Sequence, residues 1–300
     1  MKPSVARLAG ARRLRIGAVA AVAVLVIAAV CAGVASAAPT GEFAVFAECP
    51  LANPETNGCI DAKTESGKFV VGKETVPIEK AITLQGGFHE SESGAQTFIG
   101  AEHGNTLSKT PQRVPGGLAG LVKCNEIGNV IERVACEVVF ENGVTGVNDT
   151  TELAKPAGAI GLNEENLLSE TGVALSLPVK VHLENPFLGS ECYIGSNSSP
   201  IVIELTTGAT SPPPPNKSIR GSRGTLESNA EGTILTISKN SLLNNSFAAP
   251  GANGCGGIFA FLVDPIVDSK LGLPSAAGHN TAILNGTLKQ AGAEAVREHS

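Results

Sequence analysis

Alternation of apolar and polar residues is the strongest pattern in this chain, and it is clearest between residues 175 and 183. In that stretch, LSLPVKVHL, apolar side chains occupy every second position, with polar residues or a proline between them. Side chains of a β-strand point alternately to the two faces of a sheet, so this period predicts a half-buried strand. Pro178 has no N–H to donate to a neighbouring strand, which predicts an edge strand or a bulge.

Seven further segments have the length and composition of short strands, each bounded by Gly, Asn, Ser or Pro. They are residues 42–49, 68–72, 81–88, 135–143, 200–208, 233–240 and 281–288. No regular helices separate them. The predicted fold class is therefore mainly β: an antiparallel β-sandwich or distorted barrel with a few short helices, stapled by disulfides.

Two segments have a helical pattern instead. Residues 125–135 predict a short helix because their large apolar side chains recur on one face. These side chains are Ile127, Val130, Ile131 and Val134. Residues 256–272, GGIFAFLVDPIVDSKLG, predict either a buried helix that Pro265 interrupts or a pair of strands.

The first 37 residues have the pattern of a signal peptide. A basic start leads into an apolar run and then into Ala35-Ser36-Ala37, the small-x-small pattern of a cleavage site. Cleavage after Ala37 would leave residues 38–290 as a secreted β-rich domain and residues 291–300 as a flexible tail. The alternative is an uncleaved membrane anchor, because the apolar run reaches the about 20 residues that span a bilayer. The rest of the chain lies outside the cytoplasm in either case.

Removal of this leader makes the chain strongly acidic. Five of the 22 basic residues belong to the leader, which leaves 17 against 28 acidic ones and a formal charge of −11. Such a domain gains no electrostatic attraction to phosphate backbones, so nucleic acid is excluded as an expected partner. The expected partner is an extracellular ligand or an envelope component, and a membrane only if the leader stays attached.

Six cysteines remain in the exported part, and an even number in an exported protein predicts disulfides. Six cysteines allow about fifteen connectivities, of which we expect the sequential one. The expected pairs are Cys49–Cys59, Cys124–Cys136 and Cys192–Cys255. The chain contains no CxxC, so neither a thioredoxin-like redox centre nor a paired zinc knuckle is indicated.

Candidate catalytic, cofactor-binding and metal-binding residues are not apparent. The five histidines form neither HExxH nor HxH, and the densest polar cluster, FHESES around His89, is interpreted as a solvated turn. GxSxG does not occur in the exported part, although a serine triad assembled in space would leave no such trace. GANGCGG, residues 251–257, is interpreted as a tight turn around Cys255, and SPPPP as an inert surface loop.

The loop of residues 185–199 contains the single tyrosine, Tyr193, directly after Cys192. Asn185-Pro186 is expected to end the preceding strand, and Gly189 and Gly195 to supply turning points. We interpret the loop as a turn stapled by its disulfide, with recognition by Tyr193 as the alternative. His182, on the polar side of its strand, is expected to be exposed.

Several segments together resemble an uncharacterised group of exported actinobacterial proteins. They are APTGEFAVFAECPL, PIEKAITLQGG, HLENPFLGSECYIGSNSSPIVIELTTG, NSFAAPGANGCGG and LGLPSAAGHN. The resemblance covers most of the exported part and implies the compartment, but no activity, cofactor or catalytic residue. The sequence therefore predicts a secreted, non-catalytic binding or structural protein of the envelope or extracellular space. The alternative is a secreted hydrolase acting on polysaccharide, peptide or ester.

Overall fold

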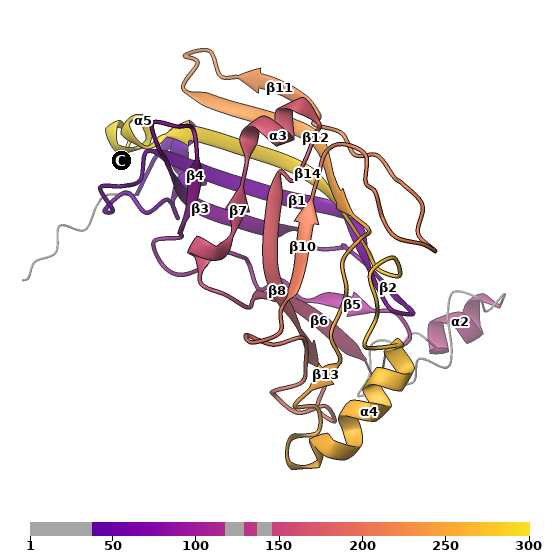
Figure 1. Ribbon diagram of the computed structural model, residues 1–300. Coiled ribbons are helices and arrows are strands. Elements are labelled where there is room, and N and C mark those ends of the chain that lie inside the picture. Colours follow the sequence, from indigo (N-terminus) through magenta and orange to yellow (C-terminus); the bar gives the residue numbers. More distant parts are fainter. Residues whose placement is uncertain (1–37, 118–128, 137–145) are drawn as a thin grey trace, which may run out of the picture. The chain divides into compact units, whose positions relative to one another are not determined.

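A computed structural model (Figure 1) describes residues 38–117, 129–136 and 146–300. The leader of residues 1–37 lies outside this part, so its cleavage stays a prediction. By its contacts, the chain from Ala38 to Ser300 belongs to one compact unit. Among the described residues, no helix is both long and apolar enough to cross a membrane.

Two antiparallel sheets make up most of this unit, which confirms the predicted fold class. In the first, sheet A, the strand order is β11-β12-β14-β1-β3-β4, and β2 also pairs with β1. Its strands are β1 (Gly58–Val71), β2 (Glu74–Pro77), β3 (Ile82–Glu90), β4 (Gln96–Gly100), β11 (Thr225–Ser228), β12 (Ile234–Asn244) and β14 (Thr281–Gly292). In the second, sheet B, the order is β13-β9-β8-β6-β5, and β10 and β7 also pair with β8. Its strands are β5 (Gln112–Val114), β6 (Val147–Leu153), β7 (Gly161–Leu162), β8 (Leu175–Glu184), β9 (Tyr193–Ile194), β10 (Ile201–Leu205) and β13 (Ala252–Asn253).

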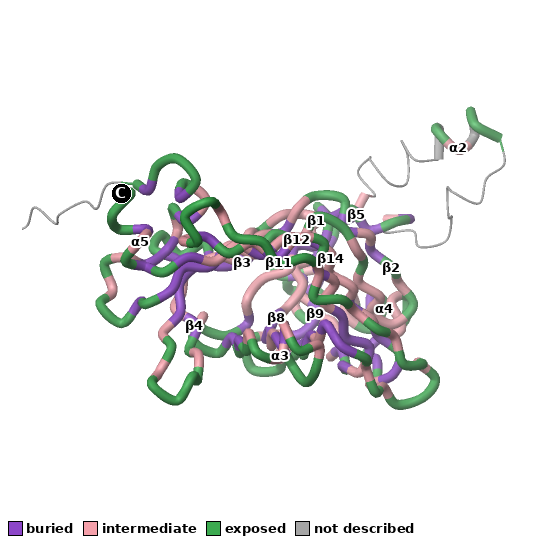
Figure 2. The backbone as a smooth tube through the Cα atoms, turned by 90° about the horizontal axis from the view of Figure 1, so that it is seen from above, coloured by how far each residue is buried: buried purple, intermediate pink, exposed green. Residues whose placement is uncertain are grey.

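The main hydrophobic core takes buried aliphatic side chains from both sheets, such as Ile60 and Leu84 of sheet A and Val179 and Ile203 of sheet B. Figure 2 shows the buried positions along the strands and the exposed ones mostly in the connections. At one margin the sheets join: the backbone groups of Thr206 and Leu243 exchange hydrogen bonds of 3.0 and 2.9 Å. The sandwich is therefore partly closed.

Strand β8 confirms the alternation on which the sequence analysis started, but the expected edge position is wrong. It pairs with β10 and β9 along one side and with β7 and β6 along the other. The carbonyl of Pro178 accepts from Ala154 N–H on the β6 side, 2.9 Å away. An N–H at residue 178 would point to that same side. There β8 has no partner strand, because its pairing with β7 ends at Ser176 and its pairing with β6 begins at Val179. An internal strand accommodates proline there because no ladder hydrogen bond is lost.

Five of the other predicted strands are confirmed within β1, β3, β10, β12 and β14. The prediction for residues 42–49 is wrong, because this segment forms a 3-10 helix, η1 (Gly41–Phe46). The prediction for residues 135–143 falls largely outside the described residues, and its first two positions end the helix α2 (Val130–Cys136).

The C-terminal residues also differ from the expected flexible tail. They finish β14 and then form α5 (Ala293–Glu298), in which Val296 is fully buried. Val296 belongs to a second, small core with Phe43 and Phe46 of η1. The ring of His299 stacks on Phe43 at 4.2 Å between centroids, and Thr40 N–H donates to the carbonyl of His299 over 2.9 Å. Aromatic contacts from the other end of the domain thus order the tail.

The remaining helical segments are short. They are η5 (Ala157–Ala159), α3 (Glu164–Ser169), η6 (Gly257–Phe259) and α4 (Ala260–Leu271). Helix α2 confirms the helical interpretation over the described part of residues 125–135, with its apolar residues exposed. For residues 256–272 the helical alternative is correct, and α4 continues through Pro265. Asn163 caps α3, because its side-chain oxygen accepts from Asn166 N–H at 2.8 Å.

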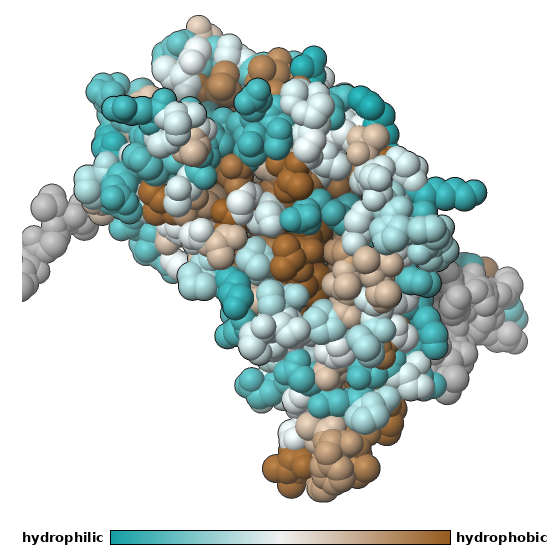
Figure 3. Space-filling model, in the orientation of Figure 1, coloured by the Kyte–Doolittle hydropathy of each residue, from teal (hydrophilic) through white to brown (hydrophobic). Residues whose placement is uncertain are grey.

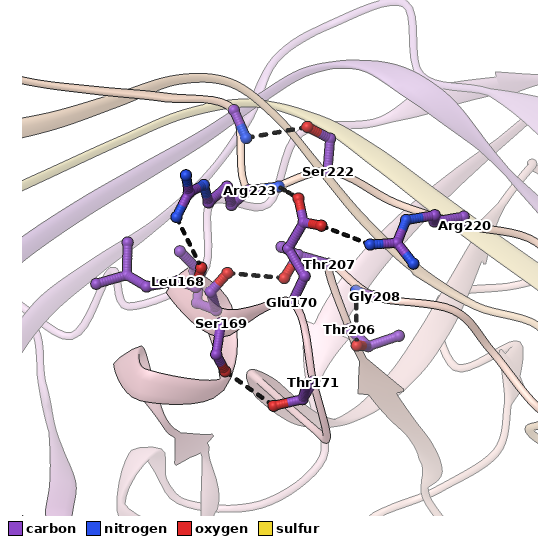
Figure 4. Close-up of polar contacts among 12 residues, drawn as sticks. Leu168, Ser169, Glu170, Thr171, Thr206, Thr207, Gly208, Arg220, Ser222 and Arg223 are labelled. Carbon is purple, nitrogen blue, oxygen red and sulfur yellow. Dashed lines mark hydrogen bonds and ion pairs between the residues drawn. The ribbon is translucent and has the colours of Figure 1, made fainter.

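The proline-rich stretch lies at the surface as expected, and a polar clamp at the end of α3 holds the chain that follows it (Figure 4). The Glu170 carboxylate accepts from Arg223 N–H at 3.1 Å and from the Arg220 guanidinium at 2.7 Å. Both donors lower the pKa of the Glu170 carboxyl group, and the backbone N–H of Arg223 lowers it more than the Arg220 guanidinium does. The Arg223 side chain donates in turn to the Leu168 carbonyl, 3.2 Å away. The clamp thereby fixes the path of the chain from sheet B into β11.

Candidate functional site

The disulfide Cys192–Cys255 forms a corner where the loop of residues 185–199 meets the segment that leads into α4. Both cysteines are fully buried, and their Cα atoms are 4.0 Å apart. The prediction of a staple at this loop is confirmed, as is Cys49–Cys59. The third predicted pair involves Cys124, which lies outside the described residues, so it stays a prediction.

The turns of this loop follow the sequence closely. Strand β8 ends at Glu184, directly before Asn185, and the backbones of Gly189 and Gly195 have φ angles of 77° and 75°. Residues with a Cβ adopt this left-handed region with difficulty, which explains the glycines. Strand β9 then pairs with β13 through Tyr193 and Ile194. The corner is held by both backbone pairing and a covalent bond.

Two aspartates attach α4 to this corner. Asp264 accepts from the N–H groups of Cys255 at 2.8 Å and Gly254 at 3.2 Å, and Asp268 accepts from Ala252 N–H at 2.6 Å. Both carboxylates are thus directed at the preceding turn and away from the opposite face of the helix. GANGCGG is the tight turn that the sequence predicts, and its amide groups are partners for these acids.

The opposite face of η6 and α4 is an exposed apolar surface, which we call the α4 ridge. It consists of Ile258, Phe259, Phe261, Leu262 and Ile266, with exposures between 56% and 86%. In Figure 3 it is the brown surface at the lower end of the molecule, where Figure 1 shows α4. A helix that is apolar around most of its circumference is usually buried on all sides. An exposed apolar surface of this kind is typical of a site that binds another molecule or a membrane.

Tyr193 anchors a second, polar cluster on the outer face of sheet B. Its ring stacks on His182 with centroids 4.6 Å apart, and the ammonium of Lys180 lies 4.1 Å from its centroid. Lys180 also contacts Glu152 at 3.8 Å, and His182 contacts Glu184 at 3.6 Å. His182 is mostly covered, its side chain only 18% exposed, so the expectation of an exposed histidine is wrong. The stack on Tyr193 covers it.

The chemistry of this polar cluster is that of a neutralised structural network. Burial raises the pKa of Tyr193, and Glu152, Glu191 and Glu184 raise it further, so the phenol keeps its proton. Positive and negative side chains contact one another here, and the cation of Lys180 already lies on the aromatic ring. The arrangement supports the stapled-turn interpretation of the loop.

The side chains of His89 and His103 take part in local contacts. His89 Nδ1 lies 2.9 Å from the carbonyl oxygen of Glu55, and His103 pairs with Glu48 at 3.4 Å. Within the described ranges, no three His, Cys, Asp or Glu side chains are grouped as metal ligands would be.

Two small cavities lie between the sheets, with volumes of about 80 and about 40 Å³. They share the lining residues Phe69, Thr151, Val179 and Ile203, so they are neighbours. The smaller one is also lined by Asp149 of β6, a strand that the sequence analysis did not predict. Asp149 is 7% exposed, and its Oδ1 has no hydrogen-bond partner. Burial, with a smaller contribution from Glu184, raises its pKa to about 7.

Comparisons with known proteins add no name to these surfaces: no family model, curated protein or solved structure matches the chain. The resemblance to exported actinobacterial proteins stays a prediction. The functional assignment therefore depends on the geometry alone.

Proposed function

We propose that this is an exported, non-catalytic binding protein of the cell envelope that attaches to a lipid surface through the α4 ridge. The two disulfides among the described residues indicate an oxidising compartment, which supports export. The observation that carries the proposal is the ridge itself: five large apolar side chains, each more than half exposed, on a helix fixed by a disulfide and two carboxylates.

The size of the ridge favours insertion into an apolar phase. Five side chains exposed to this degree offer on the order of 500 Å² of apolar surface, which is at the upper end for a single patch on a monomer. Burying half of that area stabilises attachment by about 6 kcal/mol at about 25 cal/mol per Å². Such a contribution suits reversible docking of a helix that lies in the headgroup region.

Charge around the ridge favours a lipid surface. The carboxylates of Asp264 and Asp268 are directed inward, so the outer face of α4 has no acid. Lys270 is exposed at the C-terminal end of the helix, and the ammonium of Lys73 contacts the Ser269 carbonyl at 3.2 Å. Two cations beside an apolar face match phosphate headgroups above acyl chains.

Vesicle co-sedimentation tests the attachment. The exported protein, recovered after secretion, is mixed with vesicles of phosphatidylcholine alone or with phosphatidylglycerol added. We expect binding to both, because burial of the apolar side chains supplies most of the attachment free energy, and the formal charge of −11 on the exported part opposes any gain from the anionic mixture. The double substitution Phe261→Ser and Leu262→Ser should abolish it, whereas Leu226→Ser, at an exposed apolar residue of β11, should not. Equal binding by the double variant, or no binding by the unaltered protein, would contradict the proposal.

Export is tested separately by the N-terminal residue of protein in the culture medium. A start at Ala38 supports cleavage, whereas protein found only in membranes with Met1 retained supports an anchor. Protein found only in the cytosol with reduced cysteines would overturn the envelope assignment.

The hydrolase alternative requires a histidine within reach of a nucleophile and an acid. In the part of the chain that the structure describes, two histidines contact an acid: His103, an exposed side chain 3.4 Å from Glu48, and His182 beside the Cys192–Cys255 corner. The Nε2 atom of His182 lies 3.0 Å from the backbone oxygen of Ser190, and its Nδ1 faces Glu184. Both ring nitrogens are therefore occupied by groups that cannot act as the nucleophile. The binding function is the better supported of the two.

A further inference from the structure

The cavities between the sheets have an unusual combination of lining groups. The larger is lined mainly by apolar side chains, together with Lys63, Asn240 and three threonines, while the smaller adds the side chains of Asp149 and Glu74. Asp149 reaches this cavity because it shares the inward face of β6 with Val147 and Thr151, and Thr151 lines both cavities. A carboxyl group therefore lies at one end of a mainly apolar space that continues toward the centre of the domain.

The backbone N–H of Asp149 itself donates to its carboxyl group, but one of the two carboxyl oxygens has no partner among the described residues. Its Oδ1 is buried and accepts no hydrogen bond from any described residue, although buried polar atoms almost always have one. Among the described residues, the charged side chains placed near it are acidic: Glu184 of the adjacent β8, and Glu74 of β2, which lines the same cavity. Glu184 itself accepts from the Thr150 hydroxyl at 2.9 Å and faces His182 on the outer side of the sheet. The missing group is therefore a donor, and a positive charge suits it best.

We propose that the two cavities form one binding site for a small aliphatic primary amine, with its ammonium group at Asp149 and its alkyl chain in the larger cavity. Together the cavities hold about 120 Å³, the sum of about 80 and about 40 Å³. An apolar protein cavity of about 150 Å³ accommodates the six heavy atoms of benzene, so an amine of about four carbons matches the available space. The ammonium donates to the unpartnered Oδ1 of Asp149, and the chain lies against Val179 and Ile203.

This site is independent of the α4 ridge. The proposal needs neither membrane attachment nor export, and the two sets of experiments can fail separately.

Binding of butylamine, measured by calorimetry or by chemical-shift perturbation at pH 8, tests the site. Butanol serves as the neutral ligand of similar size, and xenon reports on the apolar space alone. We expect butylamine to bind at least about tenfold more tightly than butanol, because a charge-assisted hydrogen bond contributes more than a neutral one. Lowering the pH to 5.5 protonates Asp149 and should weaken butylamine binding while leaving xenon binding unchanged.

Asp149→Asn should reduce butylamine affinity about tenfold or more and leave xenon binding intact, which also shows that the variant is folded. Glu92→Gln, at an exposed acid, is the matched control and should bind as the unaltered protein does. Three outcomes would overturn the proposal: equal affinity for butylamine and butanol, unchanged butylamine affinity in Asp149→Asn, or saturable binding of xenon alone.

Discussion

Replacing Asp149 with asparagine should change how the stability of this protein depends on pH. The carboxyl group has a pKa of 3.8 in the unfolded chain and about 7 in the folded one, chiefly because burial penalises its charged form. Since the folded value is the higher, its stabilising contribution is fully present below pH 3.8. That contribution is lost progressively as the pH rises to about 7. Asparagine keeps the shape of the side chain but does not titrate.

The magnitude follows from the size of the shift. A difference between 3.8 and about 7 corresponds to about 4 kcal/mol once the pH is well above 7. Between pH 5 and pH 8.5, this carboxyl group alone should lower the free energy of unfolding of the unaltered protein by about 3 kcal/mol. Groups distant from Asp149 contribute equally to both proteins, so the difference between variant and unaltered protein reports on Asp149 together with its interaction with Glu184. That difference should move by about 3 kcal/mol in favour of Asp149→Asn over this range.

Urea unfolding at half-unit intervals from pH 5 to pH 8.5, followed by circular dichroism with the disulfides intact, measures this difference. Glu92→Gln should show a constant difference from the unaltered protein, because that side chain is exposed. If the difference for Asp149→Asn also stays constant within about 0.5 kcal/mol, the carboxyl group is already ionised at pH 5. The reasoning from burial would then be refuted, and with it the case for a donor-binding cavity.

Three further changes have defined outcomes. Replacing both Cys192 and Cys255 with serine removes a bridge with a sequence separation of 63 residues. This should lower the free energy of unfolding, measured with urea, by about 4 kcal/mol. A loss below about 1 kcal/mol would contradict the entropic argument. Gly195→Ala should destabilise the loop by about 1 to 2 kcal/mol, since its φ is 75°, and an unchanged melting temperature would show that the turn relaxes. In an NMR titration the pKa of the Glu170 carboxyl group should lie below its usual range, because the Arg223 N–H and the Arg220 guanidinium donate to it. Arg220→Ala should raise this pKa part of the way back. An unchanged pKa in that variant would assign the whole shift to the Arg223 N–H.

The sequence was most informative where a local pattern and the tertiary structure agree. The period of two in residues 175–183 identifies β8, and the glycines around Cys192 identify the turns of its loop. The sequential order of the six cysteines alone led to the pairing of Cys192 with Cys255. In each case, one interaction dominates the local conformation and can be recognised from residue types.

The misjudged elements depend on contacts that are distant in sequence. Phe43 and Phe46 suit a strand by composition, but they pack at the i, i+3 spacing of a 3-10 turn against Val296. Strand β6, which carries Asp149, was missed because VNDTTEL is too polar to resemble a strand that is buried on one face. A polar residue at an inward position gives no signal until the register of its strand is known.

The α4 ridge could have been recognised from sequence by a stricter test of periodicity. Residues 258–266 are apolar around nearly the whole helix, which leaves no polar stripe to face water. The pattern was interpreted as burial or as a pair of strands, whereas the structure exposes half of it. Sequence identifies an apolar helix, but the elements that cover it are decided by the packing of both sheets.

The small core at the ends of the domain has a consequence for biogenesis. Thr40 and Phe43, near the start of the domain, find their partners in residues 293–299, so this part cannot assemble until nearly the whole polypeptide has been delivered. Until residues 293–299 have been synthesised, the aromatic side chains of η1 lack the partners that cover them in the folded domain. A variant truncated before Ala293 should therefore leave Phe43 and Phe46 exposed.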